Sequence, residues 1–203
     1  MTLIRHLIGD RRAASAAEFA LVLPLLLLFI FGLIDAGRFM WAYNQAEKAT
    51  QMGVRYAVAT DLVPAGLANY SFVVSGGVTA GTAVPSANFG SATCNNTSCS
   101  CTSTTGNFCS SIGYNAAAFN NTVARMRAFY GPIGPGNVLI DYRNVGLGYA
   151  GDPNGPDVAP LVTVRLTGLS FQPITTLLFR TAIGMPNFSA ALTLEDGVGS
   201  VSN

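Results

Sequence analysis

The chain has 203 residues, a formal net charge of +1 and only 10% charged residues, against about 25% in average soluble proteins. Its near-neutral charge gives no electrostatic basis for binding nucleic acid. The only histidine, His6, lies at the very start of the sequence, which excludes a Ser-His or Cys-His catalytic pair from the rest. A Gly-rich phosphate loop is also missing from the sequence. We therefore expect a protein that is not an enzyme and that uses no cofactor or metal ion.

The first long element is apolar. Sixteen uncharged residues, 19–34, follow Glu18 and are closed by Asp35 and Arg38. As a helix they would be about 24 Å long, slightly short of a hydrocarbon core of about 30 Å. A span that begins at Ala13 would reach about 33 Å but would carry Glu18 into the apolar zone. A carboxylate there is costly and usually has a partner, so we predict a transmembrane helix with a functional glutamate.

Basic residues orient this helix. Three arginines precede it, and the only acidic residue among them is Asp10. The positive-inside rule therefore predicts a cytoplasmic N-terminus and an exported remainder. The arginines are Arg5, Arg11 and Arg12. A secretory signal would have an apolar region of about 7–15 residues and a small-x-small cleavage site. The run here is longer, and residues 35–38 are a poor version of that site, which favours a retained helix.

The helix is expected to continue beyond the membrane, to about residue 60. Polar residues recur on one face and small residues on the other, where they can pack on a neighbouring helix or on the protein's own sheet. Pro24 should kink the helix near Ala20. The polar positions are Asn44, Glu47, Lys48, Gln51 and Arg55, and the opposite face carries Phe39, Ala42, Ala46, Ala49, Gly53 and Ala57.

The remainder predicts an α+β domain in which an antiparallel sheet packs on a helix. Residues 116–130 have the apolar stripe of a helix, and 138–142, 161–166 and 188–194 have the pattern of strands. Residues 61–113 are rich in Gly, Ser, Thr, Ala and Asn and predict short strands with long loops, or partial disorder. Residues 174–183 include the apolar residues Leu177, Leu178 and Phe179. We expect this segment either to fill part of the core or to form a surface loop that touches lipid or a partner.

Four cysteines crowd into this irregular segment: Cys94, Cys99, Cys101 and Cys109. An even number in an exported, loop-rich segment predicts two disulfides. Of the three possible pairings, the one that joins Cys99 to Cys101 is the least comfortable. The spacing is not that of a standard zinc site.

The N-terminal residues resemble a known family. The run 11–19, Arg-Arg-Ala-Ala-Ser-Ala-Ala-Glu-Phe, with the Leu-rich stretch and Pro24, is similar to the N-terminus of the TadE-like pseudopilins, minor subunits of bacterial tight-adherence (Flp-type) pili. Residues 31–38, 43–44 and 53–57 continue the likeness, and 188–195 resemble the family's closing strand. The resemblance implies a pilin-like fold, anchored in the bacterial inner membrane by its long helix, with a periplasmic domain that can be carried into an extracellular pilus. It also implies that Glu18, Phe19 and Pro24 serve assembly with other pilins and Tad proteins.

The resemblance further implies processing by a prepilin peptidase between Ala13 and Ala14, after Arg11 and Arg12. The family usually has Gly before the cut, where this chain has Ala13. The new ammonium group on Ala14 would lie about 6 Å from Glu18 along the helix, and the two charges would stabilise each other at low dielectric. The expected domains are a leader of residues 1–13, a long helix of 14–60 with its first half in the membrane, and an exported domain of 61–203 with a Cys-containing insert at about 64–113.

An alternative is a single-pass envelope protein unrelated to pili, acting as a binding module or as a carboxylate-based hydrolase. No pair stands out by spacing among its candidate carboxylates. Residues 151–157 could hold calcium through oxygen ligands, although their Gly and Pro content favours a turn. The candidate carboxylates are Asp141, Asp152, Asp157, Glu195 and Asp196.

Overall fold

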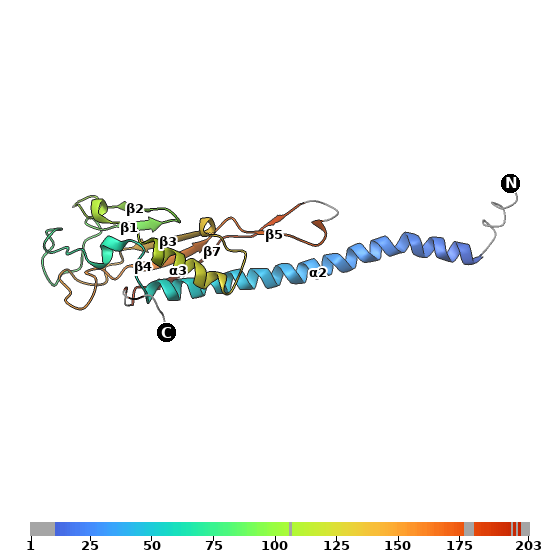
Figure 1. Ribbon diagram of the computed structural model, residues 1–203, viewed down its shortest axis with the longest axis horizontal. Coiled ribbons are helices and arrows are strands. Elements are labelled where there is room, and N and C mark those ends of the chain that lie inside the picture. The colour runs from blue at the N-terminus through green and yellow to red at the C-terminus, as the bar shows by residue number, and fades with distance from the viewer. Residues whose placement is uncertain (1–10, 106, 177–180, 196, 198, 200–203) are drawn as a thin grey trace. The chain divides into compact units, whose positions relative to one another are not determined.

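A computed structural model describes residues 11–105, 107–176, 181–195, 197 and 199, with side chains from Ser15 onward (Figure 1). The described residues fall into two compact units. Unit 1 contains the chain up to Ala42 together with Ser170–Ile183. Unit 2 contains Tyr43–Leu169 and the chain from Gly184 onward. A long apolar helix and a domain with an antiparallel sheet are both present, so the predicted α+β class is confirmed.

The long helix is α2 (Arg11–Val58), which covers 48 residues and continues through Pro24. Beyond Val58 the hydroxyl of Thr60 donates to the Tyr56 carbonyl at 2.7 Å, which satisfies one of the carbonyls left open at a helix end. The predicted polar positions between residues 44 and 55 are exposed, and the small residues from Ala46 to Ala57 are buried in unit 2. The two faces predicted from the helical spacing are therefore confirmed.

Unit 2 is built on a five-stranded antiparallel sheet with the order β2-β1-β3-β4-β7. The three strands expected from the sequence are neighbours in this sheet and end at one of its edges. Ile140 is paired with Val164, and Val164 is paired with Ala190. Two further strands come from the irregular segment. The strands are β1 (Ser91–Cys94), β2 (Cys99–Thr102), β3 (Val138–Arg143), β4 (Leu161–Leu166) and β7 (Phe188–Thr193).

One face of this sheet is covered by helix. The second half of α2 and the helix α3 (Ala116–Arg127) lie on the same side (Figure 1). At Gly53 the backbone of α2 comes so close that an added Cβ would lie 2.7 Å from Met126 of α3 and 3.5 Å from Val164 of β4. Asn115 begins α3 as an N-cap, accepting from the Ala118 amide at 3.1 Å. The small-residue face of α2 is thus used for close packing within the chain's own domain.

The segment before α3 has a core of its own. The rings of Tyr70, Phe72, Phe89 and Phe108 meet with centroids 4.8–5.4 Å apart, and the three phenylalanines are fully buried. Such aromatic contacts stabilise beyond the area they bury. The segment is therefore packed. Of its two predicted forms, short strands with long loops or partial disorder, the described residues have the first. Its short helices are η1 (Ala65–Ala68) and η2 (Phe108–Ser111), and η3 (Pro135–Asn137) precedes β3.

A short hairpin interrupts the chain between β4 and β7. Its strands β5 (Ser170–Phe171) and β6 (Ile183–Gly184) form a separate two-stranded sheet. Sequence pattern alone did not predict these two-residue strands. The predicted apolar residues Leu177, Leu178 and Phe179 lie outside the described residues.

Candidate functional site

The first half of α2 is the only described helix that is long and apolar enough to cross a membrane. None of its most apolar stretch is buried within the chain. Phe19, Pro24 and most of the apolar residues of this stretch are exposed, and Leu23 and Phe31 are half-buried. Exposed apolar patches of this size are rare on soluble monomers, so this helix fits a membrane anchor.

Glu18 is exposed at the start of this apolar stretch and makes no hydrogen bond or ion pair with any other described residue. A carboxylate that enters the hydrocarbon in this state would lack the partner that such groups usually have. The predicted processing residues Arg11, Arg12, Ala13 and Ala14 lie in the first turn of α2, and their side chains are outside the described part of the structure. Cleavage after Ala13 stays a prediction.

Asp35, which closes the apolar stretch, binds the β5–β6 hairpin. Its Oδ1 accepts from the Ile174 amide at 2.7 Å, and its Oδ2 accepts from the amide and the hydroxyl of Thr175 at 2.9 Å each. Arg38 completes the group with an ion pair to Oδ1 at 3.0 Å. The carboxylate is buried, and its charge is met by donors on both sides. We call these four residues the Asp35 clip.

Aromatic contacts extend the Asp35 clip by one helical turn. Phe39 packs edge-on against Phe171 at 5.5 Å, and the Arg38 guanidinium lies 5.3 Å from the centre of the same ring. The sequence showed Asp35 only as the end of the apolar run. Its partners on the hairpin are 139 and 140 positions away, so the one available signal was an acidic residue placed directly at that end.

The four predicted cysteines form two disulfides, Cys94–Cys99 and Cys101–Cys109. Cys94 and Cys99 are directly opposed at the end of the β1–β2 hairpin, which explains their pairing. The second bridge joins β2 to η2, next to the buried Phe108. The pairing of Cys99 with Cys101, expected to be the least comfortable, is not formed.

Two of the candidate carboxylates of the alternative hydrolase hypothesis, Asp141 and Asp157, are committed to structural contacts, and a third, Asp196, lies outside the described residues. Asp141 pairs with Arg165 at 2.6 Å and accepts from Thr93 at 2.6 Å on the open face of the sheet. Asp157 accepts backbone N–H bonds from Phe72 at 2.7 Å, Gly151 at 2.9 Å and Asp152 at 3.3 Å. Among the described residues no three acidic, histidine or cysteine side chains gather in a way that could hold a metal ion. The 151–157 segment is thus a turn braced by Asp157.

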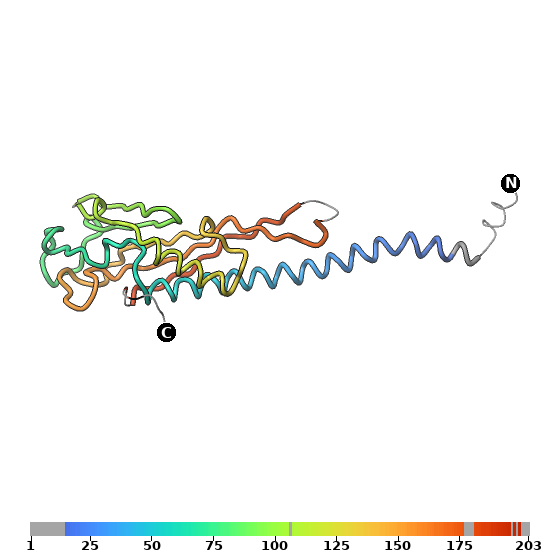
Figure 2. Tube along the Cα trace, viewed as in Figure 1, coloured from blue at the N-terminus to red at the C-terminus, as the bar shows by residue number. Residues whose placement is uncertain are grey.

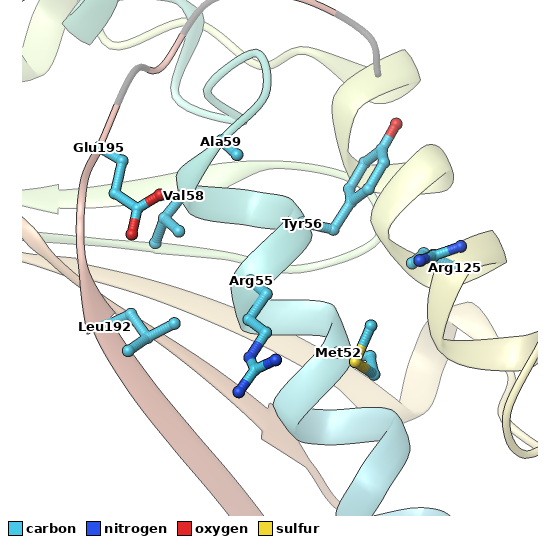
Figure 3. Close-up of a pocket in the computed structure, with 8 residues that line it drawn as sticks. All are labelled: Met52, Arg55, Tyr56, Val58, Ala59, Arg125, Leu192 and Glu195. Carbon is cyan, nitrogen blue, oxygen red and sulfur yellow. The ribbon is translucent and has the colours of Figure 1, made fainter. Parts of the chain in front are cut away.

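A shallow pocket of about 400 Å³ lies in unit 2 where α2, α3 and the end of β7 meet (Figure 3). Arg55 and Arg125 come from the two helices, with Met52 between them, and their guanidinium groups do not converge on one point. Glu195 lies on the far side of Val58. These side chains provide neither a nucleophile with a base nor a clamp for an anion, so the pocket has no arrangement for catalysis.

The comparison with family models agrees with the N-terminal pattern. Residues 13–55 match the family described as TadE-like protein. This TadE-like segment includes the apolar stretch, the Asp35 clip residues on α2 and the small-residue face as far as Gly53. Comparison with curated proteins and with solved structures gives no significant match. The resemblance stated from the sequence is confirmed for residues 13–55, which lie within α2.

Proposed function

We propose that this chain is a minor pilin, or pseudopilin, that supports assembly of a Tad (Flp-type) adhesive pilus. The observation that carries the proposal is the coincidence of the TadE-like match, residues 13–55, with a single helix. The first half of that helix is apolar and exposed, and its second half is packed on a sheet. This division suits a subunit that is stored in a bilayer and presents a folded domain outside it.

In this proposal the bacterial inner membrane holds the helix, the N-terminus is cytoplasmic and unit 2 is periplasmic. The basic residues before the apolar stretch support that orientation. The two disulfides also support it, because disulfides persist in the oxidising periplasm and are rare in the cytosol. The partners are membrane lipid, the prepilin peptidase, other pilins and the Tad assembly proteins.

Cleavage by the prepilin peptidase between Ala13 and Ala14 gives Glu18 its partner. The new ammonium group belongs either to the same subunit or to a neighbour in the assembly. Either charge alone is costly at low dielectric, and the pair is far less so. The exposed, unpartnered state of Glu18 among the described residues supports this role.

The intact mass and N-terminal sequence of protein extracted from the membranes of its bacterial host test the processing step. We expect the chain to begin at Ala14. Ala13→Gly restores the family's usual residue and should be cleaved at least as completely, whereas the bulky side chain of Ala13→Leu should block the cut. A mature chain that begins near Gly37 would indicate an ordinary secreted protein, and an intact Met1 in cells with normal pili would contradict the proposal.

A second experiment tests Glu18 itself. We expect Glu18→Ala to insert into the membrane in normal amounts but to be poorly incorporated into the pilus complex, as measured by fractionation and by co-purification with other pilins. Glu47→Ala is the matched control, because Glu47 is an exposed glutamate of the same helix within unit 2. Equal incorporation of the two variants would remove the proposed role of Glu18.

A further inference from the structure

The Asp35 clip fixes the depth of the β5–β6 hairpin along α2. Ile174 and Thr175 are bound at Asp35, one residue beyond the apolar stretch, and Phe171 packs on Phe39. At 1.5 Å per residue Asp35 and Phe39 lie about 1.5 and 7.5 Å beyond Ile34. The headgroup layer on each side of a bilayer is about 5–8 Å thick, taken as half the difference between the full thickness and the hydrocarbon core. The hairpin contacts therefore span the depth of a headgroup layer.

The hydrogen bonds of the Asp35 clip are suited to that depth. Near the hydrocarbon edge little water is available, so backbone N–H groups need partners within the protein. The amides of Ile174 and Thr175 both donate to Asp35, and in return they and Arg38 satisfy its carboxylate. Without Asp35 the two amides would lack an acceptor near the hydrocarbon, and without the hairpin the carboxylate would lack three of its donors there.

From this geometry we infer that the described part of the β5–β6 hairpin, residues 170–176 and 181–184, is a membrane-surface element that lies in the headgroup layer of the bilayer, held to the anchor helix by the Asp35 clip. The occupant of its exposed apolar surface is phospholipid. The inference rests on the proposed membrane anchor and adds a second contact with the bilayer.

The exposed side chains of the hairpin agree with this occupant. Ile174 is 40% exposed and Ile183 47% exposed, although both are large and apolar. Ile174 adjoins the end of the exposed apolar stretch of α2, because its amide donates to Asp35. The hairpin runs beside this part of the helix (Figure 2). The half-exposed Arg38 stands at the level of lipid phosphates, where a long cationic side chain can lie along apolar surface with its charge in the polar layer.

Fluorescence of single-tryptophan variants in lipid vesicles tests the inference. The chain has one tryptophan, Trp41, so Trp41→Phe gives a background into which one reporter is introduced in the full-length protein. The reporters are Ile174→Trp in the hairpin, Phe29→Trp in the apolar stretch and Val74→Trp in unit 2, where the native residues are 40%, 65% and 85% exposed. The vesicles contain phosphatidylcholine brominated either near the headgroup or near the chain end.

We expect Ile174→Trp to be quenched more by bromine near the headgroup, Phe29→Trp more by bromine near the chain end, and Val74→Trp by neither. If Phe29→Trp is quenched while Ile174→Trp behaves like Val74→Trp, the inference is overturned and the anchor stands. If Phe29→Trp is not quenched, the anchor itself is wrong, and the proposed function and the inference fail together. Stronger quenching of Ile174→Trp by the deep bromine also overturns the headgroup position.

Asp35→Asn, added to the Ile174→Trp variant, tests the clip. An amide retains one acceptor oxygen in place of two and loses the charge that pairs with Arg38, so the hairpin should be held less firmly. We expect weaker quenching by bromine near the headgroup, with emission shifted toward that of Val74→Trp. Unchanged quenching would show that Asp35 does not hold the hairpin at the membrane surface.

Discussion

The turn at residues 151–157 offers a sharp test of whether an acidic residue is structural or cation-binding. Asp157 is buried, and its three backbone donors differ in their access to water. Phe72 is fully buried, whereas Gly151 is exposed and Asp152 is half-buried. In Asp157→Ala the Phe72 amide loses its partner in a dry site, while water can replace the carboxylate at the other two amides.

The expected cost follows from these positions. One buried unsatisfied amide costs about 1–3 kcal/mol, and the loss of the charged acceptor at the two wetter amides adds about 1 kcal/mol, for a total of about 2–4 kcal/mol. For a unit of this size such a loss lowers the midpoint of thermal unfolding by about 5–15 °C. Asp157→Asn keeps one acceptor oxygen and should fall between this variant and the wild type.

Near-ultraviolet circular dichroism of the full chain in detergent measures this unfolding selectively. All seven tyrosines belong to Tyr43–Leu169, so the tyrosine signal reports unit 2. Asp152→Ala is the control, because the Asp152 side chain accepts from the exposed Asn154 amide and should shift the midpoint little. The reasoning would be refuted if Asp157→Ala unfolded at the wild-type midpoint, or if calcium raised the midpoint of the wild type but not of Asp157→Ala.

Three further predictions concern unit 2 and use the same measurement. Gly53→Ala should lower the unfolding midpoint, because the added Cβ would lie 2.7 Å from the side chain of Met126, which is fully buried and has little room to move. Overpacking of this kind costs about 1–3 kcal/mol, and the middle of that range exceeds the gain in helix propensity of about 1 kcal/mol; a higher midpoint would contradict the close approach. Replacing Cys101 and Cys109 by serine should cost about 2.5 kcal/mol through the loss of loop closure, and thiol titration of the denatured wild type without reductant should find no free thiol. Burial raises the pKa of Tyr142 well above its ordinary value, so its contribution to stability is complete below about pH 10 and is lost above it at up to about 1.4 kcal/mol per pH unit. Tyr142→Phe should therefore lose stability less steeply in alkali, and equal slopes would refute this explanation.

The elements of unit 2 were predictable where a local pattern determines them. The alternation of Val162, Val164 and Leu166 predicted β4, and its buried face is the one expected. The spacing of Ala46, Ala49 and Gly53 predicted a close helix contact but left open whether the partner was another subunit. The side chain of Met126 decides that question, since it occupies the space beside Gly53.

Other features depend on contacts between distant parts of the chain. The aromatic core around Phe72 and Phe108 gathers residues from loops with no periodicity, so composition suggested disorder as readily as packing. The Asp35 clip joins α2 to a hairpin with two-residue strands, too short for any alternating pattern. Of the candidate site, the sequence predicted the membrane anchor and singled out Glu18 at its start. The contact between Asp35 and Thr175 has no sequence signal, because it is made only when the chain folds.

The chain passes between the two units three times, after Ala42, after Leu169 and after Ile183. A water-soluble fragment obtained by trimming α2 back to Tyr43 would therefore retain Ser170–Ile183 without its helix, leaving the Phe171 ring uncovered and two amides with no acceptor. Such a fragment would be prone to self-association for reasons unrelated to the behaviour of the whole protein. The Met185 amide donates to the Leu169 carbonyl at 2.9 Å, so the two ends of the excursion already meet. Replacing residues 170–183 by a tight turn, together with removal of the chain before Tyr43, is the truncation most suited to crystallisation and solution NMR.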